Sequence, residues 1–212
     1  MLNSLVDIVL GIVQVMMNFI LFNQNRLWLL NIKELNNMRC YTFGNYYMSS
    51  IQQGIQAAHS TAELFVKYQD IGINYVNDYE PTIQEYEHQD KVQDLYDWAE
   101  NHKTMVCLNG GNLQGLKDIE TLFQEIGNKL PWASFYEDEE SLGSILTNIA
   151  IIVPEYIEDT SAKIRTGDLV QIGNKLFDKY CTELYNPARA KIVLNDFEIK
   201  LIQLLNSCQL AR

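Results

Sequence analysis

Positive charge is scarce in this sequence and nowhere gathers into a cluster. The chain has 16 lysines and arginines against 27 aspartates and glutamates, which gives a formal net charge of −11. The region from Asp70 to Glu100 holds nine carboxylates but one basic residue, Lys91, and the run EDEE follows at 137–140. Because such a field repels phosphate backbones, the composition argues against extended nucleic-acid binding. It leaves an acidic surface that would suit a protein partner.

Paired cysteines are also missing. The four cysteines, Cys40, Cys107, Cys181 and Cys208, lie far apart, and no two form a CxxC pair. This spacing excludes a zinc signature and a dense disulfide framework. We expect reduced thiols in a cytoplasmic protein, two of them in buried strands. The sequence predicts neither a metal site nor a cofactor.

Glycine motifs of the common catalytic and phosphate-binding loops are absent. The chain has no G-x-S-x-G elbow and no G-x-x-x-x-G-K-[ST] loop. The segment GNLQG at 111–115 has the glycines but lacks the lysine. It therefore predicts no phosphate cradle.

A long apolar run occurs at the N-terminus, over residues 4–22, and it approaches the ~20 residues that span a bilayer. Asn3, just before the run, and Asp7, Gln14 and Asn18 within it share one helical face. No basic region precedes it, which argues against a cleaved signal peptide. Two hypotheses stay open. Residues 1–37 form an amphipathic extension, which we favour, or residues 4–22 cross a membrane and leave the main domain in the cytoplasm.

The pattern from Met38 to Pro154 alternates between strands and helices and predicts an α/β domain at 38–154. Strands are expected at 39–48, 103–110, 130–138 and 144–154, and helices at 51–66, 81–102 and 112–127. This order predicts a small mixed four-stranded sheet flanked by helices, with a parallel first pair and an antiparallel last pair. Residues 155–212 form a third part, a helical C-terminal extension with helices at 155–165, 168–185 and 187–209.

The helix at 51–66 has two contrasting faces. Its apolar residues, predicted to face the core, are Ile51, Ile55, Ala58, Ala62, Phe65 and Val66. Its polar row is Gln52, Gln53, Gln56, His59, Ser60 and Glu63. Gly54 predicts the close approach of another backbone or a ligand, and Ser49 or Ser50 predicts an N-cap.

The polar row is the first candidate site. Gln52, Gln56, His59 and Glu63 follow one another at spacings of four, three and four, so they share a face. They would form a pocket wall at the edge where open α/β sheets hold ligands, with His59 as a general base. A solvated glutamine-rich surface is the alternative.

The acidic run after the third strand is the second candidate site. Asp138, flanked by Glu137, Glu139 and Glu140, would orient a nucleophilic water or bind a hard cation, and crowding would raise the pKa of these carboxylates. The hydroxyls of Ser141 and Thr147 follow as weaker candidates. A solvated acidic loop is the alternative.

Several segments together resemble the archaeal/eukaryotic-type, or class 2, peptidyl-tRNA hydrolases. MSSIQQGIQAAHST keeps Met48, Gln56 and His59 at the spacing of that family's first helix. KTMVCLNG, KLPWASFYEDEES and TNIAIIVP are similar to its later strands, so the resemblance covers about residues 39–154. It implies the mixed sheet and a hydrolase that cleaves an ester or amide of a nucleotide- or aminoacyl-linked substrate.

The resemblance also implies roles for individual residues. His59, Gln56 and Asp138 would be catalytic and position water, while Gln52, Glu63, Ser141 and Thr147 would bind substrate. Gln52 stands where the family has a lysine, and it offers a neutral dipole in place of a charge. EESLG replaces a Gly-Arg-Thr run and reverses the local sign of charge.

Two functional hypotheses follow from these departures. The chain is a divergent hydrolase, or it is a catalytically inactive hydrolase-like scaffold that binds a protein or small ligand through its acidic surface. The sequence leaves a homodimer open.

Overall fold

A computed structural model of the chain describes residues 37–69, 82–125, 127–138, 143–178 and 192–211. The expected N-terminal extension, apart from residue 37, lies outside these ranges. So does Ser141, one of the predicted site residues.

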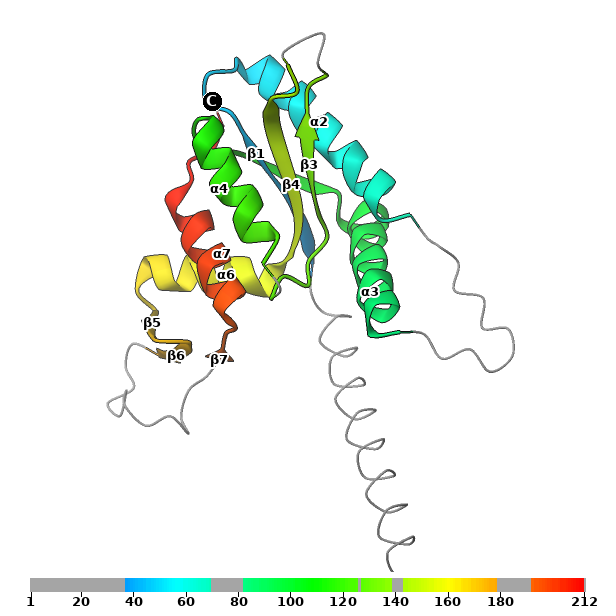
Figure 1. Cartoon of the computed structure of the whole chain (residues 1–212). Coiled ribbons are helices and arrows are strands. Elements are labelled where there is room, and N and C mark those ends of the chain that lie inside the picture. Colours follow the sequence, from blue (N-terminus) through cyan, green and yellow to red (C-terminus); the bar gives the residue numbers. More distant parts are fainter. Residues whose placement is uncertain (1–36, 70–81, 126, 139–142, 179–191, 212) are drawn as a thin grey trace, which may run out of the picture. The chain divides into compact units, whose positions relative to one another are not determined.

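A mixed four-stranded sheet forms the centre of the described chain (Figure 1). Its strands are β1 (Met38–Gly44), β2 (Thr104–Asn109), β3 (Trp132–Tyr136) and β4 (Leu146–Pro154), in the order β2-β1-β4-β3. β1 pairs with β2 in parallel, and β4 pairs antiparallel with both β1 and β3. The predicted fold class, a small mixed four-stranded sheet flanked by helices, is confirmed.

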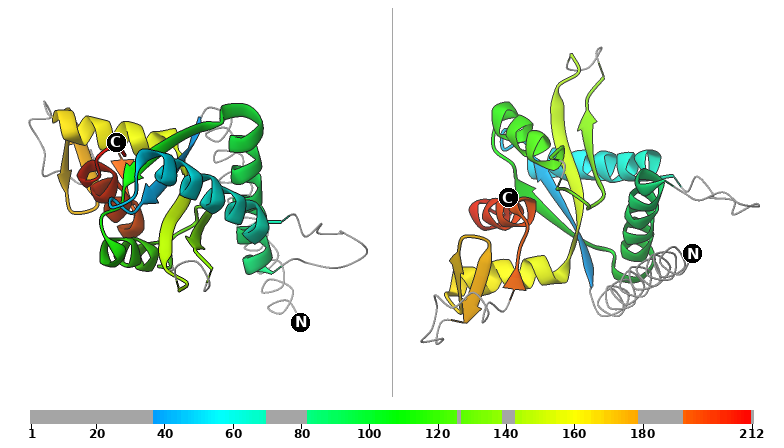
Figure 2. Two further views of the ribbon diagram at one scale, coloured as in Figure 1. Left: turned by 90° about the horizontal axis from the view of Figure 1, so that it is seen from above. Right: turned by 60° about the horizontal axis from the view of Figure 1, so that its bottom comes forward.

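Helices cover both faces of this sheet (Figure 2). On one face lie α2 (Ser50–Lys67) and α3 (Ile83–Asp97), and on the other lie α4 (Leu113–Phe123) and α7 (Asp196–Ser207). All nine residues of β4 are buried, as expected for a strand with both faces covered. Ile149 and Ile151 belong to the core under α4 and α7, and Ala150 and Ile152 belong to the core under α2 and α3.

The connection from β1 to α2 is set by local polar contacts. β1 ends at Gly44, four residues before the predicted end, because the Asn45 side chain accepts a hydrogen bond from the backbone N–H of Tyr47 and turns the chain. Ser49 then caps α2 as predicted: its hydroxyl accepts from the N–H of Gln52, and the Gln52 side chain accepts from the N–H of Ser49. This reciprocal pair is a capping box.

The orientation of α2 is opposite to the prediction. The residues that it buries against the sheet are Gln53, Gln56, Ala57, Ser60 and Leu64. Ile51, Ile55, Ala58, Ala62 and Val66 are exposed, and Phe65 is half-buried. The physical reason is that β4 presents polar side chains to α2, so amides and hydroxyls find hydrogen-bond partners there.

Two further predictions are wrong. A Cβ atom built on Gly54 would meet nothing within 4 Å, so no close approach requires this glycine. The helix predicted at 112–127 ends earlier than expected, because α4 stops at Phe123 with Gln124 as its C-cap.

α3 and the helical turn that follows it cover nearly the same residues as the helix predicted at 81–102. Thr82 caps α3 through a capping box with Glu85, and a π-helical turn, η1 (Trp98–His102), extends it to Lys103. Lys103 adopts a left-handed conformation with φ of 54°. Val92, Leu95 and Trp98 are buried and pack into the core on the α2–α3 face of the sheet.

The C-terminal part is helical at its two ends. α6 (Glu155–Thr166) agrees with the predicted helix at 155–165. α7 covers only Asp196–Ser207 of the helix predicted at 187–209, because Ile192–Val193 form strand β7 and Asn195 caps the helix. The predicted helix at 168–185 is wrong where it is described, because β5 (Leu169–Ile172) and β6 (Lys175–Asp178) form a hairpin that β7 (Ile192–Val193) extends. Gly173, with φ of +61°, takes the left-handed conformation that its tight turn requires.

No helix within the described ranges is long and apolar enough to cross a bilayer. The run at 4–22, on which the membrane hypothesis depends, lies outside them.

Candidate functional site

A chain of three polar side chains joins α2 to the β3–β4 hairpin. Thr147 Oγ1 donates to Gln56 Oε1 at 2.8 Å, and Gln56 Nε2 donates to Glu137 Oε1 at 2.5 Å. Gln56 and Thr147 are buried, and Glu137, the last of the three hydrogen-bonded side chains, is half-buried. Because Thr147 fills the carbonyl side of the amide, Gln56 must turn its NH₂ group to the carboxylate.

A second polar pair lies one turn further along α2. Ser60 Oγ donates to Asn148 Oδ1 at 2.7 Å, and both side chains are buried. Gln53, on the preceding turn, donates from Nε2 to the carbonyl oxygen of Met48 at 3.1 Å. Its buried Oε1 has no hydrogen-bond partner among the described residues. α2 therefore contacts the sheet through a layer of neutral hydrogen-bonding groups.

His59 lies beside this layer at the surface. Its ring is exposed and meets the ring of Phe135 edge-on, with the ring centroids 4.6 Å apart. Phe135 and Glu137 are two residues apart at the end of β3, and Gln56 and His59 are three residues apart on α2. The imidazole and the Gln56–Glu137 pair thus belong to the same contact between α2 and β3.

The structure brings three of the seven predicted site residues to this contact: Gln56, His59 and Thr147. Asp138 is exposed and follows Glu137, and its backbone oxygen accepts from the N–H of Ser144 at 3.4 Å. The carboxylate bonded to Gln56 is that of Glu137, which the sequence offered only as a neighbour of Asp138.

The remaining predicted residues have other positions. The Gln52 side chain caps α2 through its carbonyl oxygen, which accepts from the N–H and the hydroxyl of Ser49. Glu63 is half-buried and makes no hydrogen bond with the described residues of this cluster. Ser141 lies outside the described ranges.

The chemistry of the cluster follows from its one carboxylate. Glu137 accepts a hydrogen bond through Oε1 from an amide whose orientation Thr147 fixes. Its other oxygen can accept a hydrogen bond from water, and the imidazole of His59 carries one nitrogen that accepts and one that donates a hydrogen bond. The contact between α2 and the end of β3 therefore holds two groups that can take part in proton transfer, Glu137 and His59.

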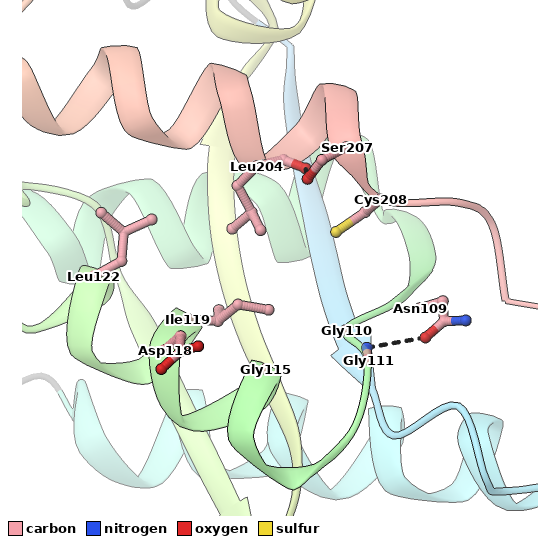
Figure 3. A pocket seen from close by; sticks show the side chains of 10 residues that line it. All are labelled: Asn109, Gly110, Gly111, Gly115, Asp118, Ile119, Leu122, Leu204, Ser207 and Cys208. Carbon is pink, nitrogen blue, oxygen red and sulfur yellow. Dashed lines mark hydrogen bonds between the residues drawn. The ribbon is translucent and has the colours of Figure 1, made fainter.

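A hollow of about 400 Å³ lies on the opposite face of the sheet, between α4 and the end of α7 (Figure 3). Ile119 and Leu122 from α4 and Leu204 and Cys208 from the α7 side line it. None of the predicted site residues contributes to this lining. A Cβ atom on Gly115 would lie 2.7 Å from the backbone oxygen of Gly110. The backbone of the loop therefore occupies the space next to Gly115, and no ligand is needed to explain this glycine.

Asn148 is the residue of the polar layer that the sequence did not reveal. It lies within the continuous apolar run of β4, where a single asparagine carries little signal. The spacings of three and four residues place Gln53, Gln56 and Ser60 on one face of the helix, but they do not indicate that this face is the buried one.

No protein-family model matches the sequence, and no curated protein matches it. The resemblance to class 2 peptidyl-tRNA hydrolases therefore rests on the quoted segments and their order along the chain.

Proposed function

We propose that the chain is a divergent class 2 peptidyl-tRNA hydrolase-like enzyme that hydrolyses an acyl ester or amide of a nucleotide- or aminoacyl-linked substrate. The hydrogen-bond chain Thr147–Gln56–Glu137 carries this proposal. It joins Gln56 of α2 to Glu137, which directly follows β3, and to Thr147 of β4, at separations of 81 and 91 positions in the sequence, and it ends on a half-buried carboxylate.

Glu137 and His59 are the proposed catalytic residues. Glu137 would take a proton from the attacking water, and His59 would exchange a proton with the leaving group or with a second water. The Asp138 carboxylate, next along the chain, would hold the water or the substrate amine. The adjacent carboxylates of Glu137 and Asp138 make the site acidic, which suits the acylated end of a substrate better than an extended phosphate backbone.

Gln56 and Thr147 are positioning residues in this proposal. Thr147 is buried, so it would act by fixing the amide of Gln56 rather than by touching the substrate. The Gln56 amide would in turn fix the rotamer of Glu137. Gln52 is exposed and lies one helical turn before Gln56 on α2. Its side-chain amide would bind the substrate carbonyl, without the charge that a lysine would supply.

A single-turnover assay on N-acyl-aminoacyl-tRNA tests the proposal. We expect Glu137→Gln and His59→Ala each to slow hydrolysis by about 10²-fold or more, the usual contribution of a general acid or base. Matched controls are Glu120→Gln, whose carboxylate accepts from the Tyr136 hydroxyl, and His88→Ala, whose ring contacts Tyr68. Both controls should keep the wild-type rate. Background turnover by the wild type would overturn the hydrolase proposal.

A non-catalytic binding module is the second candidate. The observation that favours it is the use of the Gln52 side chain in the capping box, at the position where the resembled family has a lysine. The same substrate then binds without turnover, and binding weakens when Gln56 is replaced by Leu. Absence of both binding and turnover would contradict both candidates.

A further inference from the structure

The outer face of α2 is an unusual surface for a helix of an acidic protein. Ile51, Ile55 and Val66 are 79%, 48% and 60% exposed, and Ala58 and Ala62 are exposed between them. Together these five residues, which we call the α2 stripe, form a continuous apolar row along the helix. Isolated exposed apolar residues need no explanation, but a contiguous row of them marks an interaction site.

The spacing of the α2 stripe fits a second helix. Ile51, Ile55, Ala58 and Ala62 follow at intervals of four, three and four, and Phe65 continues the series after three. This is the a/d spacing of helices that pack side by side at a small angle. The small side chains in the middle allow the backbones to approach closely.

The same row is complementary to itself. When two copies of α2 lie antiparallel about a two-fold axis between positions 58 and 59, Ile51 of one copy meets Val66 of the other, and Ile55 meets Ala62. Large side chains then lie at the two ends, and the two Ala58 residues lie on either side of the axis, each beside His59 of the other copy. A two-fold interface requires this kind of match, because each patch must fit its own copy.

The distribution of charge favours a second copy over a charged partner. Residues 45–62 contain no aspartate, glutamate, lysine or arginine, although the chain has a net charge of −11. Two copies would repel each other through most of their surface, and this neutral face is where they can approach most closely. A neutral face offers no attraction to a basic or acidic partner.

We infer that the chain forms a two-fold homodimer through the α2 stripe, with α2 packed against α2 of a second copy. A contact between two helices lies near the lower limit of specific interfaces, roughly 1,200 Å² in total, so the dimer is weak and reversible. Salt strengthens it, because the remaining electrostatic force is repulsion between like charges and salt screens that force.

Sedimentation velocity of the full chain over a wide concentration range tests the inference. The wild type should move from its 24.5 kDa mass toward twice that mass as concentration rises, and more readily at high salt. Ala58→Glu and Ile51→Glu should stay monomeric. The matched control is Ile83→Glu, because Ile83 is 78% exposed near the start of α3 and the change adds the same charge. Ile83→Glu should dimerise with an affinity close to that of the wild type.

Disulfide formation at Ala58→Cys gives a second readout that does not need a disruptive variant. The new thiol lies beside the two-fold axis and, with dissolved oxygen as the oxidant, should form an intermolecular disulfide, whereas Ile83→Cys should not. A wild type that is monomeric at every concentration overturns the inference. In that case maleimide labelling of the Ala58→Cys thiol identifies the reason. Slow labelling would mean that another segment of the chain, such as residues 4–22, covers the α2 stripe. Fast labelling would mean that the stripe is exposed to solvent. Dimers that survive Ala58→Glu overturn it as well.

Discussion

Lys67, the last residue of α2, carries a cation into contact with aromatic rings. Its Nζ lies 3.5 Å from the centre of the Trp132 ring and 5.5 Å from that of Tyr68. The ring faces attract an ammonium group. Burial acts against the charge, and the nearby Lys91 adds repulsion, so that the pKa of Lys67 falls from 10.5 to about 8.

This pKa predicts a dependence of stability on pH. Between the folded pKa of about 8 and the unfolded value of 10.5, the unfolded chain binds more protons, so the free energy of unfolding rises with pH through this window. We expect Lys67→Met to flatten the rise between about pH 8 and about pH 10, measured by urea unfolding. The control is Lys117→Met, at an exposed position on α4, which should keep the wild-type slope. Equal slopes in Lys67→Met and the wild type would contradict the prediction.

Among the helices, α2 and α4 each contain an interior glycine, but in opposite surroundings. A Cβ atom on Gly54 of α2 meets open space, and one on Gly115 of α4 lies 2.7 Å from the backbone oxygen of Gly110. Alanine is the better helix former by about 1 kcal/mol when it fits. Gly54→Ala should therefore raise the free energy of unfolding by about 0.5–1 kcal/mol, and Gly115→Ala should lower it.

Denaturant unfolding of the two glycine variants beside the wild type checks both signs, and each variant serves as the control for the other. A loss of stability in Gly54→Ala would show that this glycine has a contact outside the described residues. An unchanged Gly115→Ala would show that the loop can move away from the new methyl group.

Elements with a local signal were predictable from the sequence. The apolar runs of β2 and β4, the cap at Ser49, and the order of the strands along the chain all agree with the structure. The hairpin of β5 and β6 was missed because a helical reading of 168–185 passed over the turn signal Gly173–Asn174. The sequence of the hairpin alone does not show that β6 also pairs with β7.

The orientation of α2 could not be predicted from its own sequence. The Ile51–Val66 row is the more apolar face, so burial of apolar surface favours it. The face that is buried depends on Asn148 and Thr147, which lie about 90 residues further along the chain and provide hydrogen bonds for Ser60 and Gln56. This is why the sequence identified Gln56, His59 and Thr147 as candidates but not Glu137 as the partner of Gln56.

At the scale of the described body, the two faces of the sheet have different chemistry. The α2 face holds a layer of amides and hydroxyls that ends at Glu137 and His59, and the α4–α7 face holds an apolar hollow lined by Ile119 and Leu204. We propose that the substrate binds at the α2 face. A small apolar ligand would instead bind in the hollow between α4 and α7.

The location of binding is most directly tested by an NMR titration with a non-hydrolysable amide analogue of N-acyl-aminoacyl-adenosine. The account predicts that the side-chain NH₂ signals of Gln56 and the ring signals of His59 shift in a saturable way, while the methyl signals of Ile119 and Leu204 do not. Shifts confined to Ile119 and Leu204, or no saturable shift at all, would contradict it.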